Sequence, residues 1–303
     1  GGIVFDRVVL TRDLVDVAGA VLGRAGEVVS VASVREAARA ASPGPRSPLA
    51  RSAVAADLHL PLADAPFRHL FRGEEVRSAV ARVVLSARLP AALFEELRAL
   101  RAADPTRYRH AVTTAAVTVR LLMVAVGDAP ALPDLAAAAL LHDLGMRDAA
   151  SAAARTSGAL DREGVRAVAA HPLLGGLHLA RHLGAHPAVE AALCHHWKSG
   201  AGYPALARPP SRSVEVVGVA SAFVALTQPR PYRSGAYDAR GAADVLIQEA
   251  HARCADPSAV RLLVHALRGG KGELQTLRFG RQRVGQAPSV NRHTPIAPTD
   301  ASL

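Results

Sequence analysis

The chain has 303 residues, half of them apolar, with only 4% aromatic and 20% charged residues. These proportions exclude disorder over most of the length and are typical of a globular protein with one large or two modest domains. Alanine dominates the apolar share and aromatic residues are scarce. We therefore expect a mainly α fold whose helices meet through small side chains.

The formal net charge of +10 comes from 34 Arg and only two Lys residues. The Arg residues are spread over every predicted helix and do not gather in one stretch. This spread favours a solvated basic surface over DNA or RNA binding, although an acidic or phosphate-bearing ligand stays compatible with it.

The two cysteines, Cys194 and Cys254, show no CxxC spacing and suit the reducing cytosol. The N-terminus lacks a basic region followed by an apolar stretch, and the apolar segments further on are interrupted at Arg120 and Asp134. We therefore expect a cytoplasmic protein with no membrane-spanning segment.

The first 65 residues predict a small module and a linker. Between residues 8 and 31, Val and Leu alternate around glycines, which predicts short strands with turns. Ser33 and Glu36 have the spacing of a capping box, which predicts a helix that begins at Ser33. Residues 1–41 are thus expected to form a small α+β module, and residues 42–65, which begin with the Pro- and Ser-rich SPGPRSPLARS, a linker.

From residue 66 the apolar period becomes helical. We expect a connecting helix within 66–89, a helical domain over 90–270, and a largely disordered tail over 271–303, where the composition turns polar. The first predicted helix of the domain has an apolar face around Leu93 and Leu97. The further predicted helices are 107–126, 133–144, 161–170, 173–183, 187–197, 213–227, 239–254 and 257–268.

Eight of the 13 histidines lie between residues 110 and 196, and several fall at predicted helix ends. His110 lies in one helix, His142-Asp143 end a second, His171 ends a third, and His195-His196 end a fourth. Imidazoles and a carboxylate that converge from four helices predict a metal centre. The alternative is a set of core histidines with hydrogen-bond partners, but the apolar surroundings LLHDLG and ALCHHW favour metal ligation.

The donor types indicate the chemistry. The carboxylate of Asp143 can bridge two cations, and nitrogen and oxygen ligands without sulfur favour Fe, Mn, Zn or Ni. Two divalent ions about 3.5–4 Å apart would clamp a phosphoryl group, which makes phosphoester hydrolysis the natural reaction. A second set, His178, His182 and His186, has no neighbouring carboxylate in the sequence, and we expect it to form an exposed helical stripe.

The order of these motifs resembles the HD-GYP subgroup of the HD-domain phosphohydrolases over residues 90–268. The motifs LLHDLG, HPLLGG, HHWKSGAGYP and ALTQPRPYR occur in the order of that family and at nearly its spacings. The resemblance implies an HD-type helical bundle and a metal-dependent phosphodiesterase that acts on cyclic di-GMP. The module at 7–41 also looks like the small regulatory domain that often precedes such domains.

The resemblance further implies individual roles. The metals would be iron or manganese, with zinc or nickel as alternatives, and one or two ions would be bound. The first ion would be held by His110, His142 and Asp143, and the second by Asp143, His171, His195 and His196. His142 and Asp143 would be the catalytic pair. The substrate would be bound by Gly202, Tyr203, Pro204, Arg230 and Arg233.

Four positions depart from the family pattern. Met146 stands where the family has Lys, Ser199 replaces a carboxylate in a segment one residue shorter, and Ser221 replaces a metal-binding Asp, with Val224 in place of a second Asp. Only Asp143 would then offset the charge of the metals, so we expect a weakly loaded centre and slow turnover. A phosphohydrolase with impaired activity and an inactive domain that senses a nucleotide or binds a signalling protein both remain open, as does a homodimer.

Overall fold

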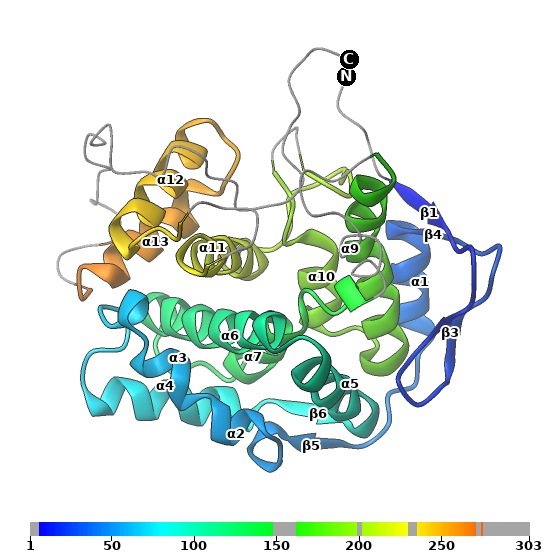
Figure 1. The fold of residues 1–303 in the computed structure, drawn as a ribbon, viewed down its shortest axis with the longest axis horizontal. Coiled ribbons are helices and arrows are strands. Elements are labelled where there is room, and N and C mark those ends of the chain that lie inside the picture. The colour runs from blue at the N-terminus through cyan, green and yellow to red at the C-terminus, as the bar shows by residue number, and fades with distance from the viewer. Residues whose placement is uncertain (1–5, 148–161, 199–201, 230–234, 271–273, 275–303) are drawn as a thin grey trace.

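The computed structural model describes residues 6–147, 162–198, 202–229, 235–270 and 274, and this part of the chain is mainly helical (Figure 1). The mainly α prediction is confirmed. Arg230, Arg233 and Ser199 lie outside the described residues, as does the predicted tail apart from Leu274.

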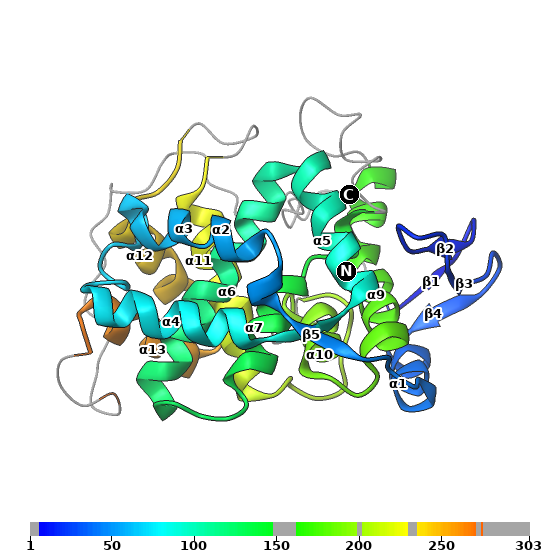
Figure 2. The same ribbon diagram turned by 90° about the horizontal axis from the view of Figure 1, so that it is seen from below.

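The N-terminal module consists of two antiparallel strand pairs and one helix, and it lies at one end of the molecule beside α9 (Figure 2). Its elements are β1 (Arg7–Val9), paired with β4 (Val28–Ser30), β2 (Leu14–Val15), paired with β3 (Val21–Gly23), and α1 (Val31–Ala40). Short strands were expected here, and they are present. The predicted helix start was wrong: Ser30 is the N-cap, and Ser33 is its inner partner, donating its amide to Ser30 Oγ at 3.2 Å and accepting the Ser30 amide at 2.8 Å.

Residues 42–65 fold onto the core, in contrast to the linker that the sequence predicts. They hold β5 (Arg46–Pro48), which pairs with β6 (Arg88–Pro90), and the short helices η1 (Leu49–Arg51), α2 (Val54–Asp57), α3 (His59–Ala63) and, just beyond, η2 (Ala65–Phe67). Leu49, Val54 and Leu58 are buried. Burial of these side chains outweighs the local preference of Pro, Gly and Ser for open loops.

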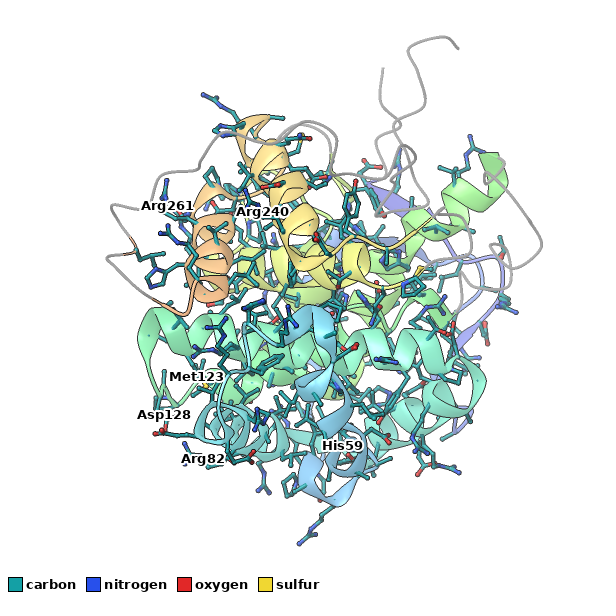
Figure 3. All side chains as sticks on the ribbon, turned by 60° about the vertical axis from the view of Figure 1, so that its left-hand side comes forward. His59, Arg82, Met123, Asp128, Arg240 and Arg261 are labelled. Carbon is teal, nitrogen blue, oxygen red and sulfur yellow. The ribbon has the colours of Figure 1, made fainter. Side chains whose placement is uncertain are left out.

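The helical body surrounds α6, which packs against α7 on one side and α11 on the other (Figure 1). Its helices are α4 (Glu74–Ser86), α5 (Ala91–Ala103), α6 (Pro105–Val126), α7 (Leu132–Leu141), α9 (Arg162–Leu183), α10 (Pro187–Cys194), α11 (Arg212–Thr227), α12 (Ala239–His251) and α13 (Pro257–Leu267). At the surface, Arg82 of α4 reaches Asp128 after α6 at 3.5 Å, and the two side chains lie together in Figure 3.

Small side chains line the contact between α6 and α7, as the composition predicts. Ala115 and Ala116 of α6 are fully buried, and so is the alanine run 136–139 of α7. Alanine lets two helix backbones approach closely at little cost in side-chain entropy. This close packing brings the ends of the helices, which carry the candidate ligands, into one region.

Helix α6 is long and apolar enough to cross a membrane, but 67% of its most apolar window is buried inside the protein. The interruption expected at Arg120 does not end the helix. The Arg120 side chain leaves the apolar surface by donating Nε to the carbonyl of Leu70 at 2.8 Å. The apolar character of α6 is therefore that of a core helix.

The two helices predicted at 161–170 and 173–183 are one helix, α9, with Pro172 inside it. Proline has no amide proton to give to the carbonyl four residues earlier, which here belongs to Val168. That carbonyl accepts from Nδ1 of His171 at 2.5 Å instead. The helix continues because the hydrogen bond that proline removes is replaced by a side-chain donor.

Candidate metal centre

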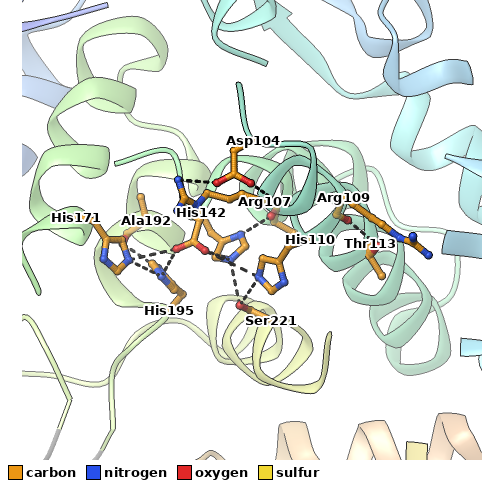
Figure 4. Close-up of polar contacts among 12 residues, drawn as sticks. Asp104, Arg107, Arg109, His110, Thr113, His142, His171, Ala192, His195 and Ser221 are labelled. Carbon is orange, nitrogen blue, oxygen red and sulfur yellow. Dashed lines mark hydrogen bonds and ion pairs between the residues drawn. The ribbon is translucent and has the colours of Figure 1, made fainter. Parts of the chain in front are cut away.

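The six predicted ligands converge in the core of the helical body. Figure 4 labels four of them, His110, His142, His171 and His195. The ligand atoms of the six residues form two groups, each with all atoms within 4.8 Å of one another: Asp143, His171, His195 and His196, and His110, His142 and Asp143. Asp143 belongs to both groups. Either group could hold a metal ion.

The six ligands come from four segments of the chain, which are α6, the end of α7, α9 and the end of α10. His110 projects from α6, and His142 caps the C-terminus of α7, so that Asp143 follows in the turn beyond. His171 lies within α9, and His195 caps the C-terminus of α10. Helix ends bring both an exposed peptide group and a change of chain direction, and α7 and α10 supply their ligands there. The prediction that His171 ends a helix was wrong, because α9 continues past it to Leu183.

Three of the imidazoles are oriented by backbone carbonyls. In each, Nδ1 donates to a carbonyl three residues earlier in the chain. The contacts are His142 to Ala139 at 2.7 Å, His171 to Val168 at 2.5 Å, and His195 to Ala192 at 3.0 Å. A neutral imidazole with its proton on Nδ1 presents a lone pair on Nε2, which is the form that binds metals.

The three Nε2 atoms surround Asp143. Its Oδ1 lies 3.3 Å from Nε2 of His171 and 3.1 Å from that of His195, and its Oδ2 lies 3.6 Å from that of His142. The Nε2 atoms of His171 and His195 are themselves 3.1 Å apart. Two lone pairs and a carboxylate at this distance repel one another unless a cation lies between them, so the donor set fits a divalent metal.

The electrostatic environment keeps the ligands in their metal-binding forms. Burial lowers the pKa of His142 to about 4, so its imidazole is neutral at pH 7. Burial by itself would raise the pKa of Asp143, but the imidazoles of His142, His171 and His195 outweigh it and hold that pKa well below its usual value. The carboxylate is therefore ionised.

Ser221 of α11 occupies the place where the resemblance implies an Asp. Its Oγ lies 3.2 Å from Nε2 of His110 and 3.1 Å from Nε2 of His142. A hydroxyl has one proton and can donate to only one of these two nitrogens. Within the described residues, Asp143 is the one carboxylate in either ligand group, so two divalent ions would be poorly neutralised.

The basic residue next to Met146 does not replace the missing Lys. Arg147 donates Nη1 to both carboxylate oxygens of Glu96, at 2.7 and 2.8 Å, and Nη2 to the carbonyl of Val15. Its guanidinium is thus committed to other parts of the protein.

The loop at residues 202–204 lies against the centre. The ring of Tyr203 stacks on that of His196, with centroids 4.7 Å apart and planes at 21°. One face of the ring is therefore covered by a candidate ligand. A side chain at Gly202 would lie 2.2 Å from the amide nitrogen of Lys198, so the loop requires glycine.

A cavity of about 80 Å³ adjoins His195, His196 and Ser221. Pockets for small molecules have volumes of about 300–1,000 Å³. The described residues therefore enclose space for ions and water here, while residues 148–161, 199–201 and 230–234 are not described.

Two glycines that the sequence analysis passed over position the ligands. A Cβ on Gly145 would lie 2.1 Å from the carbonyl oxygen of His171, and a Cβ on Gly218 would lie 3.1 Å from that of His195. Glycine inside or next to an apolar helical pattern was the available signal, because it often marks a close approach of two backbones.

The second histidine set is not an exposed stripe, so that prediction was wrong. His178 and His186 are buried, and His182 is largely so. Each faces one carboxylate through Nε2: His178 faces Glu96 at 3.4 Å, His182 faces Asp16 at 3.4 Å, and His186 faces Asp134 at 3.3 Å. These acids come from distant parts of the chain, which the local sequence does not reveal.

Neither a family model, nor a curated protein, nor a solved structure matches this chain. The fold and the site by themselves define a class: a mainly helical protein with a buried His/Asp cluster that could hold a metal ion.

Proposed function

We propose that this chain is a metal-dependent phosphohydrolase of the HD-GYP type, acting in the cytoplasm on cyclic di-GMP or a related nucleotide at a reduced rate. One observation supports the metal most directly. Imidazoles of His142, His171 and His195 have Nδ1 committed to backbone carbonyls, and their Nε2 atoms converge on the ionised Asp143.

The donor set favours iron or manganese, with zinc or nickel as alternatives. All donors in the two groups are imidazole nitrogens or carboxylate oxygens. A divalent ion bound there would supply Lewis acidity toward a phosphoryl oxygen and would acidify water.

The residues of the chain itself would hold the metal and set the charge around the substrate. Asp143 would hold the metal through oxygens that already lie among the imidazoles, and His142 would stay neutral because burial lowers its pKa to about 4. Met146 supplies no positive charge for a phosphate, and Ser221 supplies no negative charge for a second ion. Loss of these two charges would remove several kcal/mol of transition-state stabilisation, which corresponds to several powers of ten in rate.

The same two substitutions favour a second candidate, a catalytically inactive domain that binds the nucleotide and signals to a protein partner or a second copy of the chain. Ser221 lies between two candidate ligands with no charge of its own. Such a domain would keep its ligand cluster for binding alone.

Metal analysis after anaerobic purification tests the shared basis of both candidates. We expect about one transition-metal ion per chain in the wild type and a loss of most of it in Asp143→Asn. Asp134→Asn is the matched control, since Asp134 also faces a histidine, His186, but lies outside both groups. A wild-type protein without metal would refute both candidates.

Incubation with cyclic di-GMP and Mn²⁺ or Fe²⁺ then separates them. Product that disappears in Asp143→Asn supports the enzyme. Binding by calorimetry without product supports the sensor, and neither binding nor product would exclude cyclic di-GMP as the ligand.

A further inference from the structure

A single buried carboxylate joins three of the elements around the metal centre. Glu96 of α5 is 1% exposed. Its Oε1 accepts the amide of Val17 at 2.8 Å, both of its oxygens accept Nη1 of Arg147 at 2.7 and 2.8 Å, and Nε2 of His178 lies 3.4 Å from Oε1. These partners come from the hairpin of β2 and β3 in the N-terminal module (residues 14–23, the N-terminal hairpin), from the turn after α7 and from α9.

Arg147 lies in the turn that carries Asp143. The carbonyl of Asp143 accepts the amide of Met146 at 2.9 Å, and the carbonyl of Leu144 accepts the amide of Arg147 at 3.2 Å. The guanidinium of Arg147 reaches both Glu96 and the carbonyl of Val15. The turn is thus tied to α5 and to the hairpin at a point four residues from Asp143.

The same turn lies directly against α9, which carries His171. A Cβ on Gly145 would lie 2.1 Å from the carbonyl oxygen of His171 and 2.5 Å from the amide nitrogen of Gly175. The backbones of the turn and of α9 are in direct contact. A change in how the turn packs would therefore alter the position of Asp143 relative to His171. A displacement of this kind changes the geometry of the second ligand group.

We propose that Glu96 and Arg147 are positioning residues that set the metal affinity of the centre, and that the N-terminal hairpin takes part through Val15 and Val17. This inference rests on the proposed metal binding. Buried ion pairs that tie several elements together support ligand geometry, and loss of a residue that holds a metal ligand in place typically costs 10–100-fold in affinity.

Arg147→Met and Glu96→Gln test the proposal, with Mn²⁺ affinity measured by competition with a chelating indicator and with thermal unfolding recorded on the same samples. We expect each variant to bind Mn²⁺ about tenfold more weakly. Arg147→Lys, which keeps the charge but loses the forked contact, should recover part of the affinity. In the double variant the loss should be less than the product of the two single losses, because the residues act as one pair.

Arg181→Met is the matched control. Arg181 also ties the hairpin to α9, by donating Nε to the carbonyl of Leu22 at 3.1 Å, but it does not reach the turn of Asp143. We expect its Mn²⁺ affinity to stay within about twofold of the wild type, although its unfolding temperature falls.

The outcomes separate the two proposals. A wild type that binds none of Mn²⁺, Fe²⁺, Zn²⁺ and Ni²⁺ overturns the proposed function. A wild type that binds Mn²⁺ together with Arg147→Met and Glu96→Gln variants of equal affinity overturns only the positioning role, even where their unfolding temperatures fall. If Arg147→Met does not fold, Glu96→Gln, which keeps the size and one acceptor oxygen, decides the question.

Discussion

The two histidine sets of this protein are both buried, yet their imidazoles meet carboxylates in different ways. In the metal centre, Nδ1 of His142, His171 and His195 donates to backbone, and the Nε2 lone pairs gather around one shared carboxylate. In the second set, each imidazole faces a carboxylate of its own. At His186, Nδ1 accepts the amide of Ala188 at 3.1 Å, so the proton lies on Nε2 and points toward Asp134.

This contrast shows that burial alone does not make a histidine a metal ligand. Each ring of the second set has one carboxylate within 3.4 Å that it does not share with another ring of that set. Rings whose lone pairs meet at one carboxylate have an unfavourable arrangement that a cation would relieve.

The two ends of α10 offer the sharpest comparison, because His186 caps its N-terminus and His195 its C-terminus. We expect His195→Ala to lower metal affinity at least about 100-fold, since even residues that only support a ligand cost 10–100-fold. His186→Ala should leave metal affinity unchanged and cost about 1 kcal/mol of unfolding free energy through loss of the cap. Metal titration and denaturant unfolding of both variants check this pair. Equal metal affinity in the two would remove the distinction between the sets.

A second carboxylate at Ser221 should strengthen the centre. Ser221→Asp places a negative charge beside His110 and His142, and we expect metal affinity to rise about tenfold and the number of bound ions per chain to increase. Ser221→Ala is the control, because it removes the hydroxyl without adding charge. An unchanged ion content in Ser221→Asp would show that charge at this position does not limit loading.

Pro172 tests the orientation of a single ligand. In Pro172→Ala the restored amide can donate to the carbonyl of Val168 and compete with Nδ1 of His171 for it. We expect metal affinity to fall about three- to tenfold while the unfolding free energy stays equal or rises by about 1 kcal/mol, because an interior proline is removed. Thermal unfolding and metal titration of one preparation measure both quantities. A parallel fall of the two would point to general damage to α9.

The smallest expected effect concerns the pKa values of two carboxyl groups, Asp143 and Glu215. Asp143 has imidazole neighbours that lower its pKa, whereas burial, with Asp256 nearby, raises the pKa of Glu215 to about 7. A raised pKa means that the folded state binds the proton more tightly than the unfolded state. The contribution of Glu215 to stability therefore falls as pH rises from about 4.5 to about 7 and is constant above that.

We expect Glu215→Gln to match the wild type near pH 4.5 and to be more stable by about 1 kcal/mol at pH 8. Denaturant unfolding across this range is the measurement. A constant difference at all pH values would show that Glu215 does not titrate with a raised pKa.

Short-range sequence patterns predicted much of the helical structure. Apolar period and breakers located α6, α7 and α11 to within a few residues, because each helix buries one continuous apolar face. The continuity of α9 could not be read, since the donor that compensates for Pro172 is the side chain of the preceding histidine. Residues 42–65 were misread because the partners of Leu49 and Leu58 lie in other elements.

The amino-acid sequence alone determined which residues would gather at the candidate centre, because they lie in or directly after apolar helical segments: His110, His142, Asp143, His171, His195 and His196. Only the tertiary structure decided that Nε2 of His171 and Nε2 of His195 meet at Asp143. It also decided that His178, His182 and His186 each face an acid, and that Glu96 connects the β2–β3 hairpin to the turn of Asp143. The physical reason is that these contacts depend on side chains from elements far away in the chain, which come close to one another only after the helices have packed.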